Sequence, residues 1–401
     1  MIHVTKNKYN STIFLYYILI FCTNLFFYEG VWVLYWNKYM TYQLLGIVGA
    51  VAFVIGLILE IPSGAIADTI GRKKIIVVSL LFLILSGILL TSATNALFLI
   101  GGVIFLQFGV SFLSGTLEAL LYDNMKDSGI ADRFDIVISR GIVLGILGVA
   151  VSIFVGGYVY DLGNRLPYMF WTLSSLVALI AAFYLKDSQK YDEKDMAESW
   201  LVNFKDGIYE LVKPNNRYIS FSILTTFGVF YYFDWGFYKS VIAIENGMSA
   251  FVQSSVFSTS NIIASIFIFL LLPRLYSRLN KNLILMGTSL LIGVSLLYLT
   301  RRLDLYAAVP ITLVIIGGNV FSSAASVLLN ERVASEHRAT TLSAATFLSK
   351  IVFILLTAIS GKLIEMGKLD DITVFLSMIA LSPLFIFLFM RKRAKHIYTK
   401  S

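Results

Sequence analysis

Long apolar runs separated by short polar loops dominate the hydropathy pattern of the chain. A helix that crosses a bilayer needs about 20 mostly apolar residues. Twelve runs have about that length, at 12–36, 41–62, 75–94, 96–122, 137–160, 167–185, 217–239, 250–272, 283–300, 305–329, 339–363 and 371–390. The first is too long for a signal peptide and lacks a small-residue cleavage site, so we predict an uncleaved helix. The pattern therefore predicts an all-α integral membrane protein with twelve transmembrane helices.

Composition excludes an ordinary soluble enzyme. Of the 401 residues, 58% are hydrophobic and only 14% are charged, which is too little charge to cover a soluble particle. The single cysteine, Cys22, cannot form an intrachain disulfide, and His3, His337 and His396 lie in tails or loops. We therefore expect no metal centre and no cofactor. The chain also has no G-x-x-x-x-G-K-[ST] loop for binding a nucleotide.

The distribution of lysine and arginine predicts the orientation. With twelve spans both termini lie on one side, and the loops on that side carry most of the basic residues, including Arg72 to Lys74 and the tail from Arg391. The positive-inside bias then places both termini in the cytoplasm, in a protein of the cell membrane. This bias also accounts for the net charge of +8 without a nucleic-acid partner.

The chain divides into two apolar bundles, residues 1–186 and 217–390, joined by a charged linker at 187–216 and followed by a basic tail at 391–401. Apolar residues recur at helical spacing in the linker, which predicts an amphipathic helix at the cytoplasmic interface. A solvated charged face explains the charge of the linker more simply than a docking site does. The recurring residues are Met196, Trp200, Leu201, Phe204, Ile208, Leu211 and Val212.

The two bundles match each other at an offset of about 205 residues, as an internal duplication would produce. Residues 157–163, GYVYDLG, align with residues 361–367, GKLIEMG, and Glu29 aligns with Asp234. Arg133 falls on Arg338 at the same shift. We therefore expect two six-helix repeats related by an axis along the membrane normal, and a solute path where they meet.

The loop between the second and third spans carries the most specific motif. It reads EIPSGAIADTIGRKK over residues 60–74 and resembles the loop signature of the major facilitator superfamily, with Thr69 standing where that family has a basic residue. The resemblance implies twelve helices in two repeats, and a latch in which Asp68 and Arg72 close the cytoplasmic side. A loop that only sets topology is the alternative. The matching positions are Gly64, Asp68, Gly71, Arg72 and Lys73.

The corresponding loop of the second half keeps Arg278 and Lys281 but lacks the acid, which predicts an asymmetric latch. The stretch from Ser114 to Asp123, followed by Arg133 and a glycine-rich fifth span, is also similar to bacterial drug-efflux members of the family. Two features depart from that group: the fifth span has no proline, and the fourth has no embedded arginine.

Ionisable side chains inside spans are functional candidates because burying a charge in a bilayer is costly. Glu29 lies roughly 12 Å from the outer end of the first span, at 1.5 Å per residue, and Asp234 takes the matching place in the seventh. Both are interpreted as proton carriers or cation-binding groups, with hydrogen bonding between helices as the alternative. Lys350 lies near the middle of the eleventh span and needs an acid partner, for which Glu29, Asp234 and Glu118 are candidates.

Charges at the inner end of the fourth and fifth spans are candidates for a gate. Glu118 and Asp123 lie there with Arg140, and a structural ion pair is the simpler interpretation. Polar groups within spans can contact substrate, although hydrogen bonds between helices explain them as well. These groups are Asn24, Gln107, Asn261 and Asn319.

Aromatic residues crowd around the two acids and favour an amphiphilic, cationic solute through charge and cation-π attraction. The outermost of them, Tyr35, Trp36 and Tyr238, are expected in the interfacial belt instead. The residues assigned to the central cavity with Glu29, Asp234, Lys350, Asn24 and Asn319 are Tyr28, Trp32, Tyr231 and Phe233.

Together these features predict a secondary transporter, and no enzyme, that works by alternating access and exports amphiphilic or cationic compounds against inward proton flow. Its partners are a small-molecule substrate, protons and membrane lipid, and we expect a monomer. Uptake or lipid-like flipping by the same fold is one alternative. A membrane receptor or scaffold that transports nothing is another.

Overall fold

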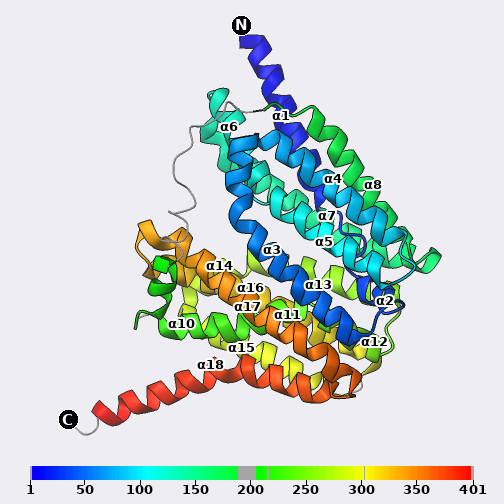
Figure 1. Ribbon diagram of the computed structural model, residues 1–401. Coiled ribbons are helices and arrows are strands. Elements are labelled where there is room, and N and C mark those ends of the chain that lie inside the picture. Colours follow the sequence, from blue (N-terminus) through cyan, green and yellow to red (C-terminus); the bar gives the residue numbers. More distant parts are fainter. Residues whose placement is uncertain (1, 188–204, 215, 302, 399–401) are drawn as a thin grey trace. The chain divides into compact units, whose positions relative to one another are not determined.

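The computed structural model describes residues 2–187, 205–214, 216–301 and 303–398, and every regular element in them is helical. The all-α prediction is confirmed. Ten stretches of the described chain are long and apolar enough to cross a membrane as continuous or nearly continuous helices. The first and seventh predicted spans are interrupted instead (Figure 1). The twelve predicted spans thus correspond to ten such stretches and two broken ones.

The chain forms two compact units, each described here by itself. Unit 1 comprises Met1–Met40, Val51–Ala197 and Ala250–Ser258, and unit 2 comprises Thr41–Ala50, Glu198–Ser249 and Thr259–Ser401. The start of α3 (Tyr42–Ile70) therefore belongs to unit 2 and the start of α13 (Ala250–Leu270) to unit 1. The helices up to the linker are α1 (Ile2–Thr23), α2 (Trp32–Trp36), α3 (Tyr42–Ile70), α4 (Arg72–Thr91), α5 (Ala96–Leu113), α6 (Thr116–Asp127), η1 (Ala131–Arg133), α7 (Phe134–Leu162) and α8 (Leu166–Phe183).

The second set of helices repeats this order after the linker. They are α10 (Arg217–Ser222), η2 (Ile223–Phe227), α11 (Gly228–Trp235), α12 (Tyr238–Glu245), α13 (Ala250–Leu270), α14 (Leu272–Arg278), α15 (Lys281–Tyr298), η3 (Asp304–Ala307), α16 (Ala308–Arg332), η4 (Ser335–His337), α17 (Arg338–Glu365) and α18 (Leu369–Tyr398). The segment η2 is a π-helix, which adds a local irregularity to the seventh span.

Equivalent contacts recur in the two units at the offset that the sequence predicts. A Cβ atom on Gly157 of α7 would lie 2.8 Å from the carbonyl oxygen of Ala250, at the start of α13. A Cβ atom on Gly361 of α17 would lie 2.1 Å from the carbonyl oxygen of Tyr42, at the start of α3. Each contact is too close for any residue but glycine. The aligned glycines Gly157 and Gly361 therefore allow close packing against the equivalent starts of α13 and α3.

The packing of α4 against α8 in unit 1 has an equivalent in unit 2, where α15 packs against α18. A Cβ atom on Gly87 would lie 2.1 Å from Thr172 Oγ1, whereas in unit 2 Ser377 Oγ of α18 donates a 2.7 Å hydrogen bond to the Gly293 carbonyl of α15. Small residues let helices approach closely in lipid, where there is no hydrophobic effect to bring them together. The duplication therefore extends to the helix interfaces.

The linker helix predicted at the membrane interface is described by the structure only from residue 205 onward. Residues 188–204, which hold Met196, Trp200, Leu201 and Phe204, lie outside the described residues. In the following helix at 205–212, Leu211 is only 2% exposed within the core of unit 2, and Ile208 packs against the same core. A Cβ atom on Gly207 would lie 2.5 Å from the Thr340 carbonyl oxygen. Ile208 and Leu211 therefore pack on unit 2, whereas Val212 is 54% exposed, and the amphipathic helix at the cytoplasmic interface stays a prediction.

Candidate functional site

The first predicted span breaks at the acid that sequence analysis selected. The helix α1 ends at Thr23 and α2 begins at Trp32, so Glu29 lies in a non-helical segment. Two tight turns mark the break, since the amides of Phe26 and Phe27 bond carbonyls only two residues earlier. Glu29 is half-buried. Non-helical backbone at membrane depth is tolerated only where protein covers it or water reaches it.

Glycines of α7 make room for this broken segment. A Cβ atom on Gly156 would lie 1.7 Å from the Phe27 carbonyl oxygen, so any side chain there would push the segment away. A Cβ atom on Gly141 would lie 2.7 Å from Tyr16 Oη, and one on Gly145 would lie 3.4 Å from Asn24 Nδ2. The glycine-rich fifth span, one basis of the resemblance to efflux proteins, therefore has a packing role in unit 1.

The seventh span breaks at the matching place. The helix α11 ends at Trp235 and α12 begins at Tyr238, with Gly236 and Phe237 between them. Asp234 is the last-but-one residue of α11, and its Oδ1 accepts a 3.0 Å hydrogen bond from Lys239 Nζ across the break. The side chains are 13% and 3% exposed, so this ion pair is buried. The sequence analysis did not single out Lys239, the last residue of the predicted span 217–239, and missed this pairing.

Three other polar residues were predicted to line the central cavity: Lys350, Asn24 and Asn319. Lys350 is half-buried within α17, and the partner found for Asp234 is Lys239 rather than Lys350. The Asn24 and Asn319 side chains each donate to a carbonyl four residues earlier, Ile20 and Ile315. These bonds satisfy one donor of each amide within its own helix.

The aromatic residues of unit 1 form a packed cluster. The ring of Tyr28 stacks on Tyr168 at 5.1 Å and meets Trp171 edge-on at 5.0 Å. Trp36 Nε1 donates a 2.7 Å hydrogen bond to Tyr168 Oη, and Tyr35 Oη donates to the Leu90 carbonyl. The sixth span, which supplies Tyr168 and Trp171, gave no signal that it would complete this cluster.

The prediction that Tyr35, Trp36 and Tyr238 belong to the interfacial belt is wrong. Their exposures are 0%, 5% and 0%, because each phenol or indole reaches a hydrogen-bond acceptor inside its unit. Phe233 is also fully buried, against Tyr238. Other aromatic residues near the acids keep some accessible surface: Phe26, Phe27, Tyr28 and Trp32 in unit 1 and Tyr231 in unit 2 are half-buried, and Trp235, which stacks on Tyr231, is exposed.

The loop motif between α3 and α4 is an ion network within unit 1. Arg72 Nε donates a 3.0 Å hydrogen bond to Asp68 Oδ1, and Arg72 Nη1 pairs with Asp123 Oδ2 of α6. Gly71 caps α4 at a φ of +109°, a conformation that favours glycine. Lys73 Nζ donates to the Phe183 carbonyl at the end of α8. Gly64 has no atom within 4 Å of its Cβ position, so space does not demand glycine there.

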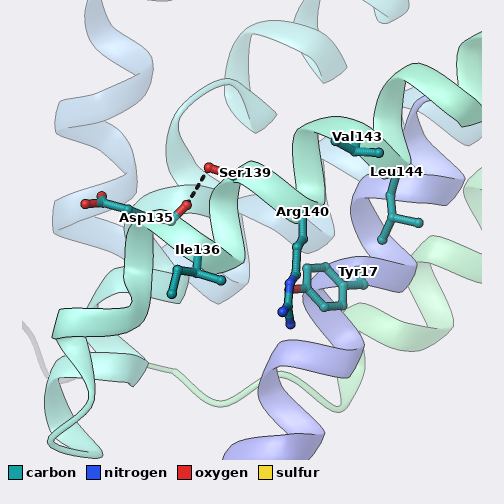
Figure 2. Close-up of a pocket in the computed structure, with 7 residues that line it drawn as sticks. All are labelled: Tyr17, Asp135, Ile136, Ser139, Arg140, Val143 and Leu144. Atoms are coloured by element: carbon teal, nitrogen blue, oxygen red, sulfur yellow. Dashed lines mark hydrogen bonds between the residues drawn. The ribbon is translucent and has the colours of Figure 1, made fainter. Parts of the chain in front are cut away.

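The charges predicted at the inner mouth separate into different environments. Asp123 pairs with Arg72 and not with Arg140. Glu118 lies in the first turn of α6, where a carboxylate is favoured by the helix dipole, and no ion pair to it is found among the described residues. Arg140 lines a pocket between α1 and α7 of unit 1 (Figure 2).

Unit 2 has an ion pair in the equivalent loop despite lacking the motif's acid. Lys281, at the start of α15, pairs with Glu331 at the end of α16. Lys281 Nζ also lies 5.7 Å from the centre of the Tyr276 ring. Buried position and the nearby Glu331 raise the pKa of the Tyr276 phenol. The acid of unit 2 therefore comes from the end of α16 rather than from the loop itself.

Comparison with known proteins agrees with this architecture. The family described as the Major Facilitator Superfamily matches residues 12–357. A curated relative, the uncharacterized MFS-type transporter YxaM of Bacillus subtilis (strain 168), is 29% identical over 143 residues, which is 35% of each chain. The alignment thus spans about a third of that relative's length.

Solved structures share the fold at low sequence identity. A point mutant of the nucleoside transporter NupG has a TM-score of 0.78 at 15% identity, covering 94% of this chain and 99% of that one. A point mutant of the peptide transporter POT has a TM-score of 0.72 at 14% identity, covering 95% and 94%. At these identities the likeness concerns the fold alone.

Proposed function

The chain belongs to the Major Facilitator Superfamily and is a multi-pass membrane transporter of small molecules rather than an enzyme, and we propose that it exports amphiphilic cations in exchange for protons. The proposed transport is by alternating access, by a monomer in the cell membrane with both termini in the cytoplasm. The observation that carries this proposal is the carboxylate at the interruption of each broken span.

The two carboxylates are proposed to act differently. Glu29 lies in a non-helical, half-buried segment, and an ionisable side chain at such a place in a membrane protein is a candidate for carrying protons. Asp234 is already paired within unit 2, since Lys239 Nζ lies 3.0 Å from its Oδ1. We therefore assign proton coupling to Glu29. Asp234, beside the Tyr231–Trp235 stack, is assigned to attracting a cationic substrate in competition with Lys239.

The test uses purified protein in liposomes that contain a pH-sensitive dye, with ethidium as the cationic probe. Wild-type protein should release protons when ethidium is added. Glu29→Gln should lose this release while still exchanging ethidium down its own gradient, because the substitution removes only the titratable group. Asp132→Asn, a change at an exposed loop acid, serves as the control and should match wild type. Proton release that persists in Glu29→Gln would refute the assignment.

The direction of transport needs a separate measurement in cells. Cells that make the protein should contain less of a fluorescent cationic dye than cells without it, and an uncoupler should raise the dye content to the level of the latter. Higher dye content in the presence of the protein would favour the uptake alternative.

A further inference from the structure

A pocket of about 660 Å³ lies in unit 1 between α1 and the first half of α7, away from Glu29 and the loop motif. Its lining combines one basic side chain with an apolar wall (Figure 2). The lining residues are Tyr17, Asp135, Ile136, Ser139, Arg140, Val143 and Leu144. None of these residues except Arg140 was singled out by the sequence, and the proposed transport does not use the pocket.

Arg140 offers its guanidinium to this pocket. Arg140 and Tyr17 both line the pocket, and in Figure 2 the Asp135 carboxylate points away from the Arg140 side chain. No hydrogen bond or ion pair to the Arg140 side chain is found among the described residues. The Tyr17 hydroxyl is buried and, within the same part of the chain, has no hydrogen-bond partner. The Ser139 hydroxyl is already used, since it donates to the Asp135 carbonyl at 2.7 Å.

An apolar strip continues from Arg140 along α7. Val143, Leu147 and Val151 are 56%, 51% and 54% exposed and lie on one face of the helix with Arg140. From residue 140 to residue 151 the helix rises about 16 Å, at 1.5 Å per residue, which is close to the length of an acyl chain. The strip ends at Phe154, whose ring packs edge-on against Phe251 at 5.5 Å.

We propose that this pocket binds an anionic membrane phospholipid, with the phosphate on Arg140 and Tyr17 and one acyl chain along Val143 to Val151. Arginine recognises phosphate through several donors, and a buried phenol without a partner supplies another. The start of α7 lies at the end of unit 1 that the lysine and arginine distribution predicts to be cytoplasmic, where the leaflet carries anionic lipid. A phosphate-bearing solute shares the head-group chemistry but would not use the strip.

The experiment is a native mass-spectrometry titration of the purified protein in detergent with phosphatidylglycerol. Wild-type protein should keep one more bound phosphatidylglycerol than Arg140→Gln. The apparent affinity of the variant for this lipid should be about five-fold lower than that of wild type. Arg140→Lys should keep most of the binding. Arg133→Gln, at a nearby exposed arginine outside the pocket, is the matched control and should bind like wild type.

Two further arms keep the test decisive. Val143→Asp places a carboxylate at an exposed position of the strip and should also weaken phosphatidylglycerol binding, in protein whose size-exclusion profile matches that of wild type. Glycerol 3-phosphate, which has the head group without chains, should not compete at millimolar concentration. Equal phosphatidylglycerol binding by wild type, Arg140→Gln and Val143→Asp would overturn the proposal. Competition by glycerol 3-phosphate would overturn it as well, in favour of a soluble solute.

Discussion

The buried pair of Asp234 and Lys239 is the residue-scale feature with the clearest energetic consequence. Removing one partner of a buried ion pair leaves the other charge uncompensated and costs about 3–5 kcal/mol. We therefore expect Lys239→Met to lower the thermal unfolding midpoint in detergent strongly. The double variant Asp234→Asn, Lys239→Met should recover most of the loss, because no buried charge remains. Losses that simply add would show that the two side chains do not interact in the folded protein.

Individual site residues were predictable where their chemistry conflicts with the membrane. A carboxylate in an apolar run is conspicuous, so Glu29 and Asp234 could be selected from sequence. Lys239 could not, because it is the last residue of the predicted span 217–239, where a long basic side chain can reach the membrane surface. Only the interruption at Gly236 and Phe237 brings residues five apart within 3.0 Å. The Arg72 pair with Asp123 was also missed, since the two are 51 residues apart and chain spacing does not indicate their contact.

The elements that depart from regular helix depend on glycine contacts from neighbouring helices. A Cβ atom added to Gly156 of α7 would lie only 1.7 Å from the Phe27 carbonyl oxygen. A Cβ atom added to Gly145 of the same helix would have its nearest neighbour at 3.4 Å. We expect Gly156→Ala to displace the segment that carries Glu29, lowering the unfolding midpoint and ethidium transport together. Overpacking of this kind typically costs about 1–3 kcal/mol.

Gly145→Ala in the same helix is the matched control. It should be neutral or slightly stabilising, because alanine is favoured over glycine in a helix by up to about 1 kcal/mol. Similar stability and transport in both variants would show that α7 does not position the broken segment. Size-exclusion profiles of both purified variants would separate loss of transport from loss of folding.

For the helices, the hydropathy pattern predicted twelve membrane spans but not the interruptions of the first and the seventh. The segment from Asn24 to Val31 contains no proline and is largely apolar, so it reads as helix. Its non-helical path is stabilised by contacts with α7, which no local pattern encodes. The same limit explains the error over Tyr35, Trp36 and Tyr238. An aromatic residue near a span end satisfies the belt pattern whether it faces lipid or, as here, its own unit.

At the scale of the whole molecule, duplication gave each unit a loop ion pair of different strength. In unit 1 the Arg72 and Asp123 side chains are 19% and 7% exposed, and Asp68 adds a second carboxylate. In unit 2 the Lys281 and Glu331 side chains are 23% and 51% exposed. Exposed pairs contribute little, typically below about 1 kcal/mol, whereas a buried charge left without its partner is costly. Both units therefore have an ion pair at this loop, and the pairs differ in how deeply their side chains are buried.

Transport rates should reveal this asymmetry if the loop pairs act as latches. We expect Asp123→Asn to reduce ethidium transport in liposomes several-fold, because Arg72 keeps only Asp68 and the link from α4 to α6 is lost. Glu331→Gln should reduce it less than two-fold, since water already screens that pair. Raising the salt concentration should diminish the Glu331 effect and leave the Asp123 effect, because screening acts mainly on exposed charges. Equal effects of the two substitutions at every salt concentration would mean that burial does not decide which loop controls transport.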